Sequence, residues 1–284
     1  MRLRADSARL RHEFRTREIQ ALFRRAPEDA FDRALELGAG DGFQSRLLVR
    51  HTRSLLSTDI NPDRLQPEPH PKIEYGVCDA EDLPYRDREF DLIFSSNLLE
   101  HLEDPVAAVA RMALSLRDNG IMVHTVPNRF WKALHMGLFY PSQLLSLVER
   151  ATGQGQPQGP RFDNNARAVP RGDGRASFLR RRLWPPPHGV SGSNMQEFVR
   201  FGRGYWTGVF AEAGLELVGT ARGLPAHSPY RFGYNGARRL FERAGFSSCT
   251  GYILRKAGHE SPYQRLFVGG SFPAGDDVRR RRDR

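Results

Sequence analysis

Three glycines and two acids are combined in the stretch "LELGAGDG", residues 35–42. Glycine has no Cβ, so a turn that contains it can take a positive φ and bring its backbone close to a ligand. The dinucleotide fingerprint G-x-G-x-x-G needs a glycine at the position of Phe43. A pyrophosphate also prefers the positive end of a helix, whereas Glu36 and Asp41 put negative charge at this turn. These residues therefore favour a cationic ligand, such as an amino-acid sulfonium, over the NAD(P) of an oxidoreductase.

Two further acids stand where predicted strands end. Asp59 ends the second strand, about 20 residues after the glycine turn, where a carboxylate accepts hydrogen bonds from both hydroxyls of a ribose. Asp79 ends the third strand, where it would meet an adenine amino group. Either acid alone would usually be a solvated strand-end residue. Their combination with the glycine turn predicts that they contact a nucleoside.

Strand-like and helix-like segments alternate over residues 31–128, as is typical of a doubly wound α/β sheet. Helices are predicted at 43–51 and at 103–120, the second beginning after a capping Asp104 and stopping at Gly120. The strands are nearly continuous apolar runs, which suits strands covered by helices on both faces. They comprise residues 31–37, 53–60, 72–80, 90–97 and 120–128.

The remaining chain is less regular. After an apolar stretch, the segment up to residue 190 is rich in Gly, Pro, Gln and Arg, which predicts an insertion that is partly disordered. Regular structure resumes where Ser193 and Gln196 have capping-box spacing. The predicted divisions are an N-terminal helical segment (1–30), a Rossmann-like core (31–128), an insertion or substrate lid (129–192), a C-terminal part of the same fold (193–257) and a basic tail (258–284).

Four motifs follow one another along the chain: "ALELGAGDG", "STDIN", "CDAEDLPY" and "FDLIFSSNLLEHLEDP". Together they resemble the class I S-adenosylmethionine-dependent methyltransferases, in particular the broad small-molecule group that includes quinone-biosynthesis enzymes. The resemblance covers residues 31–128 and continues more weakly over 193–257. It implies an α/β, Rossmann-like fold with a seven-stranded, mostly parallel sheet in the order 3-2-1-4-5-7-6, helices on both faces and an insertion after strand 5. It also implies S-adenosylmethionine as the methyl donor.

The resemblance further implies which residues contact this cofactor. Glu36, Gly38 and Gly40 would hold its methionine end. Asp59 would bind the ribose and Ile60 would pack against the adenine. Asp79 and Ala80 would meet the adenine edge. Ser95, Ser96 and Asn97 would line the floor near the sulfur.

Two histidines are candidate general bases. Methyl transfer is an in-line displacement at a sulfonium, so a base is needed only if the acceptor must lose a proton. His101 follows the fourth strand at the edge of the sheet where ligands bind, and His188 lies in the turn "PPPHG". Each has a plain alternative, as a structural or an exposed histidine. No metal site is predicted, because Cys78 and Cys249 form no ligand cluster.

The net charge of +10 at pH 7 comes almost entirely from arginine. It favours a solvated basic surface, with an anionic partner as the alternative. The chain has neither the D/N/S-P-P-Y/F run of amino-methylating DNA enzymes nor a cysteine placed for cytosine-C5 methylation. We therefore expect methylation of a hydroxyl, or of an amine, on a small-molecule, lipid-linked or glycan acceptor. The alternative is an RNA-directed methyltransferase, or a nucleic-acid-binding protein that binds S-adenosylmethionine.

The sequence also bears on location. The first 30 residues contain many arginines and no continuous apolar run, so no signal peptide is expected, and the cysteine pattern favours the cytoplasm. The most apolar window, residues 130–148, is interrupted by Lys132, His135 and Pro141. It is too mixed to span a bilayer but suits contact with a membrane surface.

Overall fold

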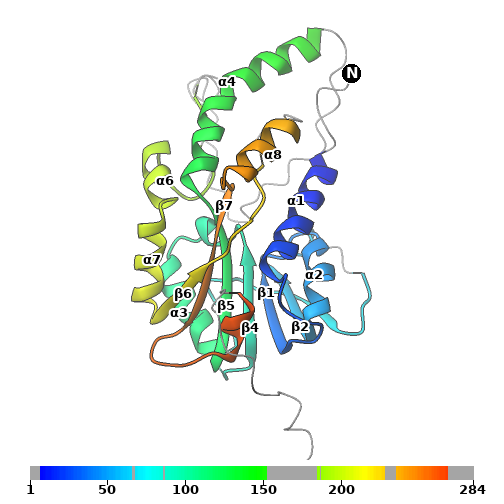
Figure 1. Cartoon of the computed structure of the whole chain (residues 1–284), viewed down its shortest axis with the longest axis vertical. Helices are drawn as coiled ribbons and strands as arrows, with labels where there is room; N and C mark the ends of the chain where they lie inside the picture. The colour runs from blue at the N-terminus through cyan, green and yellow to red at the C-terminus, as the bar shows by residue number, and fades with distance from the viewer. Residues whose placement is uncertain are drawn as a thin grey trace, which may run out of the picture.

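A seven-stranded sheet forms the centre of the molecule (Figure 1). The computed structural model describes residues 7–65, 68–85, 87–151, 184–185, 187–227 and 235–267. The sheet has the order β3-β2-β1-β4-β5-β7-β6. Its strands are β1 (Phe31–Leu37), β2 (Thr52–Asp59), β3 (Ile73–Val77), β4 (Phe90–Ser96), β5 (Leu116–Pro127), β6 (Leu215–Thr220) and β7 (Cys249–Lys256).

The pairing pattern confirms the expected Rossmann-like topology. Strands β1 to β5 pair in parallel, and β7 runs antiparallel to both β5 and β6. The carboxyl ends of the five parallel strands therefore meet at one edge of the sheet, which we call the carboxyl edge. Ligands of open α/β sheets bind at this edge.

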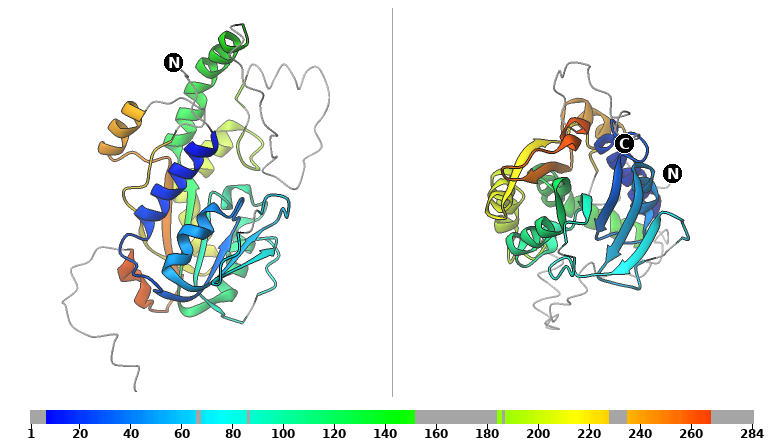
Figure 2. Two further views of the ribbon diagram at one scale, coloured as in Figure 1. Left: turned by 90° about the vertical axis from the view of Figure 1, so that its right-hand side faces the viewer. Right: turned by 90° about the horizontal axis from the view of Figure 1, so that it is seen from below.

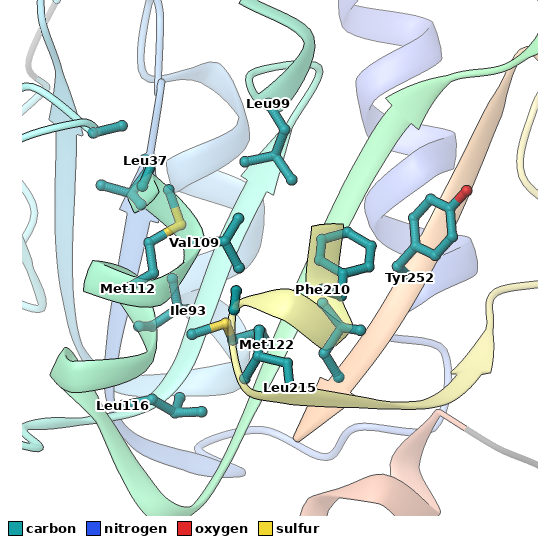
Figure 3. Packing of buried hydrophobic residues seen from close by; sticks show 14 of the residues in the cluster. Leu37, Ile93, Leu99, Val109, Met112, Leu116, Met122, Phe210, Leu215 and Tyr252 are labelled. Atoms are coloured by element: carbon teal, nitrogen blue, oxygen red, sulfur yellow. The ribbon is translucent and has the colours of Figure 1, made fainter. Parts of the chain in front are cut away.

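Helices cover both faces of the sheet. On one face lie α1 (Ser7–Leu22) and α2 (Phe43–Leu48), which contact each other and appear together in front of the sheet in the left view of Figure 2. On the other face lie α3 (Pro105–Ser115) and α7 (Arg203–Glu212), whose side chains Met112 and Phe210 join the cluster drawn in Figure 3. Each face thus has its own apolar core, and the two cores fix the helices relative to the carboxyl edge.

The predicted helix starts are confirmed at two places. Asp104 Oδ1 accepts a hydrogen bond from Ala107 N at 3.0 Å, with Pro105 at the first helical position of α3. Ser193 Oγ accepts one from Gln196 N at 3.2 Å at the start of α6 (Asn194–Arg200). Both side chains satisfy a backbone N–H that the first turn of a helix leaves without a partner.

The predicted end of the third helix was wrong. We expected the helix to continue to Gly120, but α3 ends at Ser115 and β5 begins at Leu116. Leu116 is fully buried and pairs with Phe90 of β4. Arg117 also donates a hydrogen bond of 2.6 Å to the carboxylate of Asp91. These tertiary contacts keep the segment extended, although its residues would suit a helix.

A long helix occupies the start of the predicted insertion. α4 (Arg129–Ala151) begins after Asn128, whose Oδ1 accepts from Trp131 N at 3.0 Å, and it contains Pro141. In Figure 1 α4 rises from the carboxyl edge next to α8 (Asn235–Arg243). The Gly- and Pro-rich part, residues 152–183, lies outside the described residues, as does the tail from 268. Among the described helices, none combines the length and apolar character needed to cross a bilayer.

Candidate functional site

The glycine turn lies between β1 and α2 at the carboxyl edge. Gly38, Gly40 and Gly42 all have positive φ, at 74°, 61° and 73°. A Cβ on Gly38 would lie 3.1 Å from the side chain of Leu98. The turn therefore needs glycine both for its backbone conformation and for space, as the sequence predicted.

Asp59 ties this turn to the end of β2. Its Oδ2 accepts a hydrogen bond of 2.8 Å from Gly40 N, and its Oδ1 accepts one of 3.0 Å from Asn61 N. The side chain is almost completely buried, whereas the next residue, Ile60, is 38% exposed. A carboxylate is thus fixed beside the turn, followed by an apolar side chain with free surface.

Glu36 is buried beneath the turn. Ser57 Oγ donates to Glu36 Oε2 at 3.0 Å, and Ser45 Oγ lies 2.7 Å from Ser57 Oγ. Burial raises the pKa of Glu36, although the two serine hydroxyls and the charge of Arg15 act in the opposite direction.

Asp79 and Ala80 follow β3 and reach the same edge. Cys78 N donates to Asp59 O at 3.1 Å, so the chain after β3 is held against the end of β2. Asp79 Oδ1 accepts from Glu81 N at 2.9 Å, and Ala80 is buried. The acids that the sequence placed at successive strand ends therefore lie on neighbouring chain segments.

The residues at the end of β4 point to different faces of the sheet. Ser95 Oγ lies 2.8 Å from His124 Nδ1, and His124 stacks on Phe210 of α7. Ser96 instead donates to Glu18 of α1 at 2.7 Å. Asn97 has a φ of 49° and donates from its backbone N–H to Thr125 O at 2.8 Å. Ser96 and Asn97 thus belong to the α1 side of the floor, and the Ser95 side chain belongs to the α7 side.

Helix α1 contributes charged residues that the sequence analysis missed. The fully buried Glu18 carboxylate accepts hydrogen bonds from Ser96, from Thr125 at 2.9 Å and from Gln44 at 3.0 Å. Arg15 pairs with Glu18 at 2.9 Å and also contacts Ser96. The signal was present in the spacing, because Glu18 stands four residues from Phe14 and from Leu22 on an apolar stripe. A carboxylate in such a stripe indicates a buried polar network.

A second contact places α1 over the glycine turn. His12 stacks on Phe43 with ring centroids 3.8 Å apart, and its Nε2 lies 3.2 Å from Asp41 Oδ2. Partial burial acts to raise the pKa of Asp41, but His12 and the Phe43 N–H outweigh it and lower that pKa. Asp41 is therefore a stable anion within the turn at neutral pH.

The two candidate bases lie next to each other although they are far apart in sequence. His101 ends η2 (Leu99–His101), which follows β4, and its ring centroid is 5.1 Å from that of His188. Trp131 of α4 packs against His188 at 4.8 Å. Burial lowers the pKa of each histidine to about 4, so both imidazoles are neutral at pH 7 and are weak bases. Glu100 completes a group whose ligand atoms all lie within 4.8 Å of one another.

Comparisons with known proteins match the part of the chain that includes the glycine turn and β4. Residues 35–124 match the family model Methyltransf_11, described as a methyltransferase domain. The ubiquinone biosynthesis O-methyltransferase of Hydrogenovibrio crunogenus is 26% identical over 125 residues, covering 42% of this chain and 52% of the relative. The protein of the same name in Nitrobacter winogradskyi is 29% identical over 128 residues, covering 43% and 49%. The chain thus spans about half the length of these curated relatives.

A solved structure has the same fold. A chain from the complex between the Haloferax volcanii Trm112 methyltransferase activator and a methyltransferase superposes with a TM-score of 0.53. The match covers 88% of this chain and 92% of that chain at 14% identity. At this identity the likeness concerns the fold alone.

Proposed function

We propose that this chain is a class I S-adenosylmethionine-dependent methyltransferase and that it methylates a hydroxyl, or an amine, of a small-molecule, lipid-linked or glycan acceptor. In that reaction the acceptor oxygen or nitrogen forms a bond to the methyl carbon. The carbon–sulfur bond breaks and leaves its electron pair on sulfur, so the sulfonium becomes a neutral thioether. The proton of the acceptor passes to a base or to solvent. The relatives are named O-methyltransferases, which favours a hydroxyl.

The observation that carries this proposal is the acidic character of the glycine turn. The carboxylate of Asp59 is bonded to Gly40 N at 2.8 Å, Asp41 lies within the turn, and Glu36 lies beneath it. Such a turn suits a cofactor with a sulfonium and an ammonium group and opposes a pyrophosphate. The residues present therefore fit S-adenosylmethionine.

We assign the cofactor contacts along the carboxyl edge. Glu36, Gly38 and Gly40 hold the methionine end. Asp59 binds the ribose hydroxyls, Ile60 packs on the adenine, and Asp79 and Ala80 meet its edge. Ser95, Ser96 and Asn97 form the floor near the sulfur, with Ser95 acting through its buried contact with His124.

We assign the acceptor to the space near His101, His188 and Trp131. His101 follows β4 at the carboxyl edge, Trp131 lies at the start of the predicted insertion after β5, and His188 lies near the end of that insertion. A buried, neutral imidazole accepts a hydrogen bond from an acceptor hydroxyl and orients it. His101 and His188 are thus the candidate catalytic residues of this site.

An amphiphilic acceptor is favoured by the outer half of α4. Tyr140, Leu144, Leu147 and Val148 have helical spacing and are 53%, 65%, 48% and 49% exposed. An apolar stripe of this kind binds the interface of a bilayer. We propose that α4 contacts a membrane surface from which a lipid-linked acceptor reaches the carboxyl edge.

The nucleic-acid alternative rests on basic segments that are mostly outside the described residues, namely 161–182 and 279–282. Of the N-terminal arginines, Arg15 and Arg17 pair with Glu18 and Glu242. Because their charge is neutralised within the fold, it contributes little to binding a phosphate backbone.

Labelled methyl transfer tests the proposal and the alternative together. The chain is incubated with methyl-labelled S-adenosylmethionine and a cell extract, and the extract is separated into small-molecule, lipid, glycan and RNA fractions. We expect label in one of the first three. Label in RNA alone would support the alternative, and label in no fraction would contradict the proposed activity. The matched control is Asp59→Asn, which keeps an acceptor for Gly40 N but cannot accept both ribose hydroxyls as a carboxylate does.

A further inference from the structure

Three potential metal ligands converge after β4. They are the carboxylate of Glu100 and the imidazoles of His101 and His188, whose ligand atoms all lie within 4.8 Å of one another. Glu100 Oε1 and His101 Nε2 are 3.8 Å apart. Bonds of about 2.0–2.2 Å to nitrogen and oxygen would bring these ligand atoms closer together around a shared ion.

The turn that carries His188 is held in place by buried contacts. Glu197 Oε1 accepts hydrogen bonds from His188 N at 2.6 Å and from Gly189 N at 2.8 Å. The other oxygen of Glu197 pairs with Lys132 of α4, and both side chains are fully buried. The His188 turn therefore sits on a buried, hydrogen-bonded support, as a metal site requires of its ligands.

A direct backbone contact joins the two segments of the site. Val190 N donates to Glu100 O at 3.4 Å, and a Cβ on Gly189 would clash with the same carbonyl oxygen. Glycine at position 189 thus allows the His188 turn to lie against η2. The closeness of His188 to Glu100 follows from this packing.

Among the described residues, Glu100 has no partner that explains its burial. Its side chain is 1% exposed, and neither carboxylate oxygen has a hydrogen-bond partner in the described part of the chain. His101 Nδ1 is likewise buried and unpaired. A buried polar group without a partner is costly, and a buried carboxylate is the most costly of these groups unless it is paired or binds a metal. Glu18, which is buried nearby, shows the contrast, because it accepts from Ser96, Thr125 and Gln44.

We infer that Glu100, His101 and His188 bind one divalent transition-metal ion, with Zn²⁺ as the best fit. Two imidazoles and one carboxylate are a donor set of catalytic zinc sites, in which a fourth position stays open for water or substrate. Mg²⁺ and Ca²⁺ prefer sites made of oxygen ligands alone. No metal site was predicted from the sequence, because Cys78 and Cys249 form no ligand cluster and the acid–histidine group comes together only in the fold.

The open position gives the ion a role at the acceptor site. An acceptor hydroxyl bound there would lose its proton to solvent more readily, since a bound cation lowers the pKa of a hydroxyl ligand. This role rests on the proposed methyl transfer, whereas binding of the ion does not. His101 and His188 would then act as ligands and not as bases.

The test measures metal binding by the full chain without a polyhistidine tag. After treatment with a chelator and dialysis, the chain is titrated with Zn²⁺ and with Mg²⁺ by calorimetry, and with Co²⁺ by visible absorption. We expect one Zn²⁺ per chain, a ligand-field spectrum with Co²⁺ and no comparable binding of Mg²⁺. Weak or non-stoichiometric Zn²⁺ binding, or a preference for Mg²⁺, would overturn the inference.

Variants locate the site. His188→Gln and Glu100→Gln should each weaken Zn²⁺ binding by more than about 100-fold, since even the loss of an outer partner of a ligand costs 10- to 100-fold. His259→Gln, which changes an exposed histidine far along the chain, should leave it unchanged. If Glu100→Gln does not fold, the Zn²⁺ affinity of His188→Gln and the Co²⁺ spectrum still test whether these residues bind the metal. Unchanged affinity in His188→Gln would refute the assignment.

A thermal shift with S-adenosylhomocysteine separates this inference from the proposed function. We expect the His188→Gln chain to keep its stabilisation by this ligand, which also shows that the variant is folded. Metal binding without any response of the wild-type chain to S-adenosylhomocysteine would remove the proposed function and keep the metal site. Stabilisation of the wild-type chain by S-adenosylhomocysteine without metal binding would remove the metal site and keep the proposed function.

Discussion

Glu18 Oε2 accepts a hydrogen bond of 2.7 Å from Ser96 Oγ, 78 residues away along the chain. This bond fastens α1 to the end of β4, next to the floor assigned to the sulfur of the cofactor. Thr125, Gln44 and Arg15 also donate to the same carboxylate. Helix α1 is therefore a fixed cover of the carboxyl edge, and its position depends on one buried acid.

Replacing this acid should destabilise the fold. In Glu18→Gln an amide N–H₂ takes the place of an oxygen that accepts hydrogen bonds, and Arg15 loses its counter-charge. We expect the free energy of unfolding to fall by about 2 kcal/mol. This is less than the loss for a fully buried ion pair, because Arg15 is partly exposed to solvent. Urea denaturation measures this change. Glu28→Gln, at a side chain that is 79% exposed, should change stability by less than about 0.5 kcal/mol, and equal effects of the two substitutions would contradict the account.

Much of the site was predictable because it depends on local sequence. The glycine turn needs positive φ at fixed positions, and the strand-end acids stand where apolar runs stop. The network of Glu18 was not predictable in this way, since the burial of a carboxylate depends on which faces of distant elements meet. The early end of α3 has the same origin, because the pairing of Leu116 with Phe90 outweighs local helix preference.

The residues assigned to the methyl acceptor show the same limit of prediction from local sequence. Sequence reasoning singled out His101 and His188 separately and gave no reason for them to touch. Their contact depends on the close approach of Gly189 to Glu100 and on the buried pair of Glu197 with Lys132. Glu100 itself was missed, because an acid next to a histidine at a helix start is a common surface pattern.

Gly40→Ala tests the need for glycine in the turn. At a φ of 61° an alanine is strained by about 1–2 kcal/mol, and its Cβ would lie 3.2 Å from the flexible end of Arg64. We expect the chain to lose about 1 kcal/mol of stability and to bind S-adenosylhomocysteine more weakly.

Gly208→Ala is the matched control for this substitution. Gly208 lies within α7, and a Cβ there would have no neighbour within 4 Å. This substitution should raise stability by about 0.5–1 kcal/mol, because alanine favours a helix interior. Both values follow from urea denaturation, and the same sign for the two variants would argue against the strained turn.

His124 should make the fold sensitive to acid. Burial lowers its pKa to about 3, from an ordinary value of 6.5. As the pH falls below about 6.5, the unfolded chain takes up a proton at this imidazole and the folded chain does not, so stability falls until the pH reaches about 3. Between pH 7 and pH 5 one such histidine lowers the free energy of unfolding by about 2 kcal/mol.

His124→Gln removes the imidazole that takes up this proton and keeps a polar partner for Ser95. We expect the variant to lose about 2 kcal/mol less stability than the wild-type chain between pH 7 and pH 5. His259→Gln, at an exposed position, should lose as much as the wild type. Urea denaturation at the two pH values gives the comparison, and parallel losses in all three proteins would show that His124 does not titrate as expected.

The exposed stripe of α4 makes a prediction about membranes. The full chain should sediment with vesicles that contain anionic phospholipid. Leu144→Asp or Leu147→Asp should weaken this binding by at least about 10-fold, because each leucine contributes about 1.5–3 kcal/mol on burial. Leu114→Asp on α3, at a side chain that is 54% exposed, is the control and should bind as the wild type does. No sedimentation of the wild-type chain, or an equal loss in the control, would contradict membrane contact through α4.

The central claim is that the acidic glycine turn binds a sulfonium cofactor and not a dinucleotide. Calorimetric titration of the purified chain with S-adenosylmethionine, and separately with NADH, tests it most directly. We expect binding of one S-adenosylmethionine per chain, no binding of NADH, and an affinity lowered roughly 10- to 100-fold in Asp59→Asn, since a hydrogen bond to a charged group is worth about 1.5–3 kcal/mol. Binding of NADH without S-adenosylmethionine, or an Asp59→Asn chain with unchanged affinity, would contradict the account.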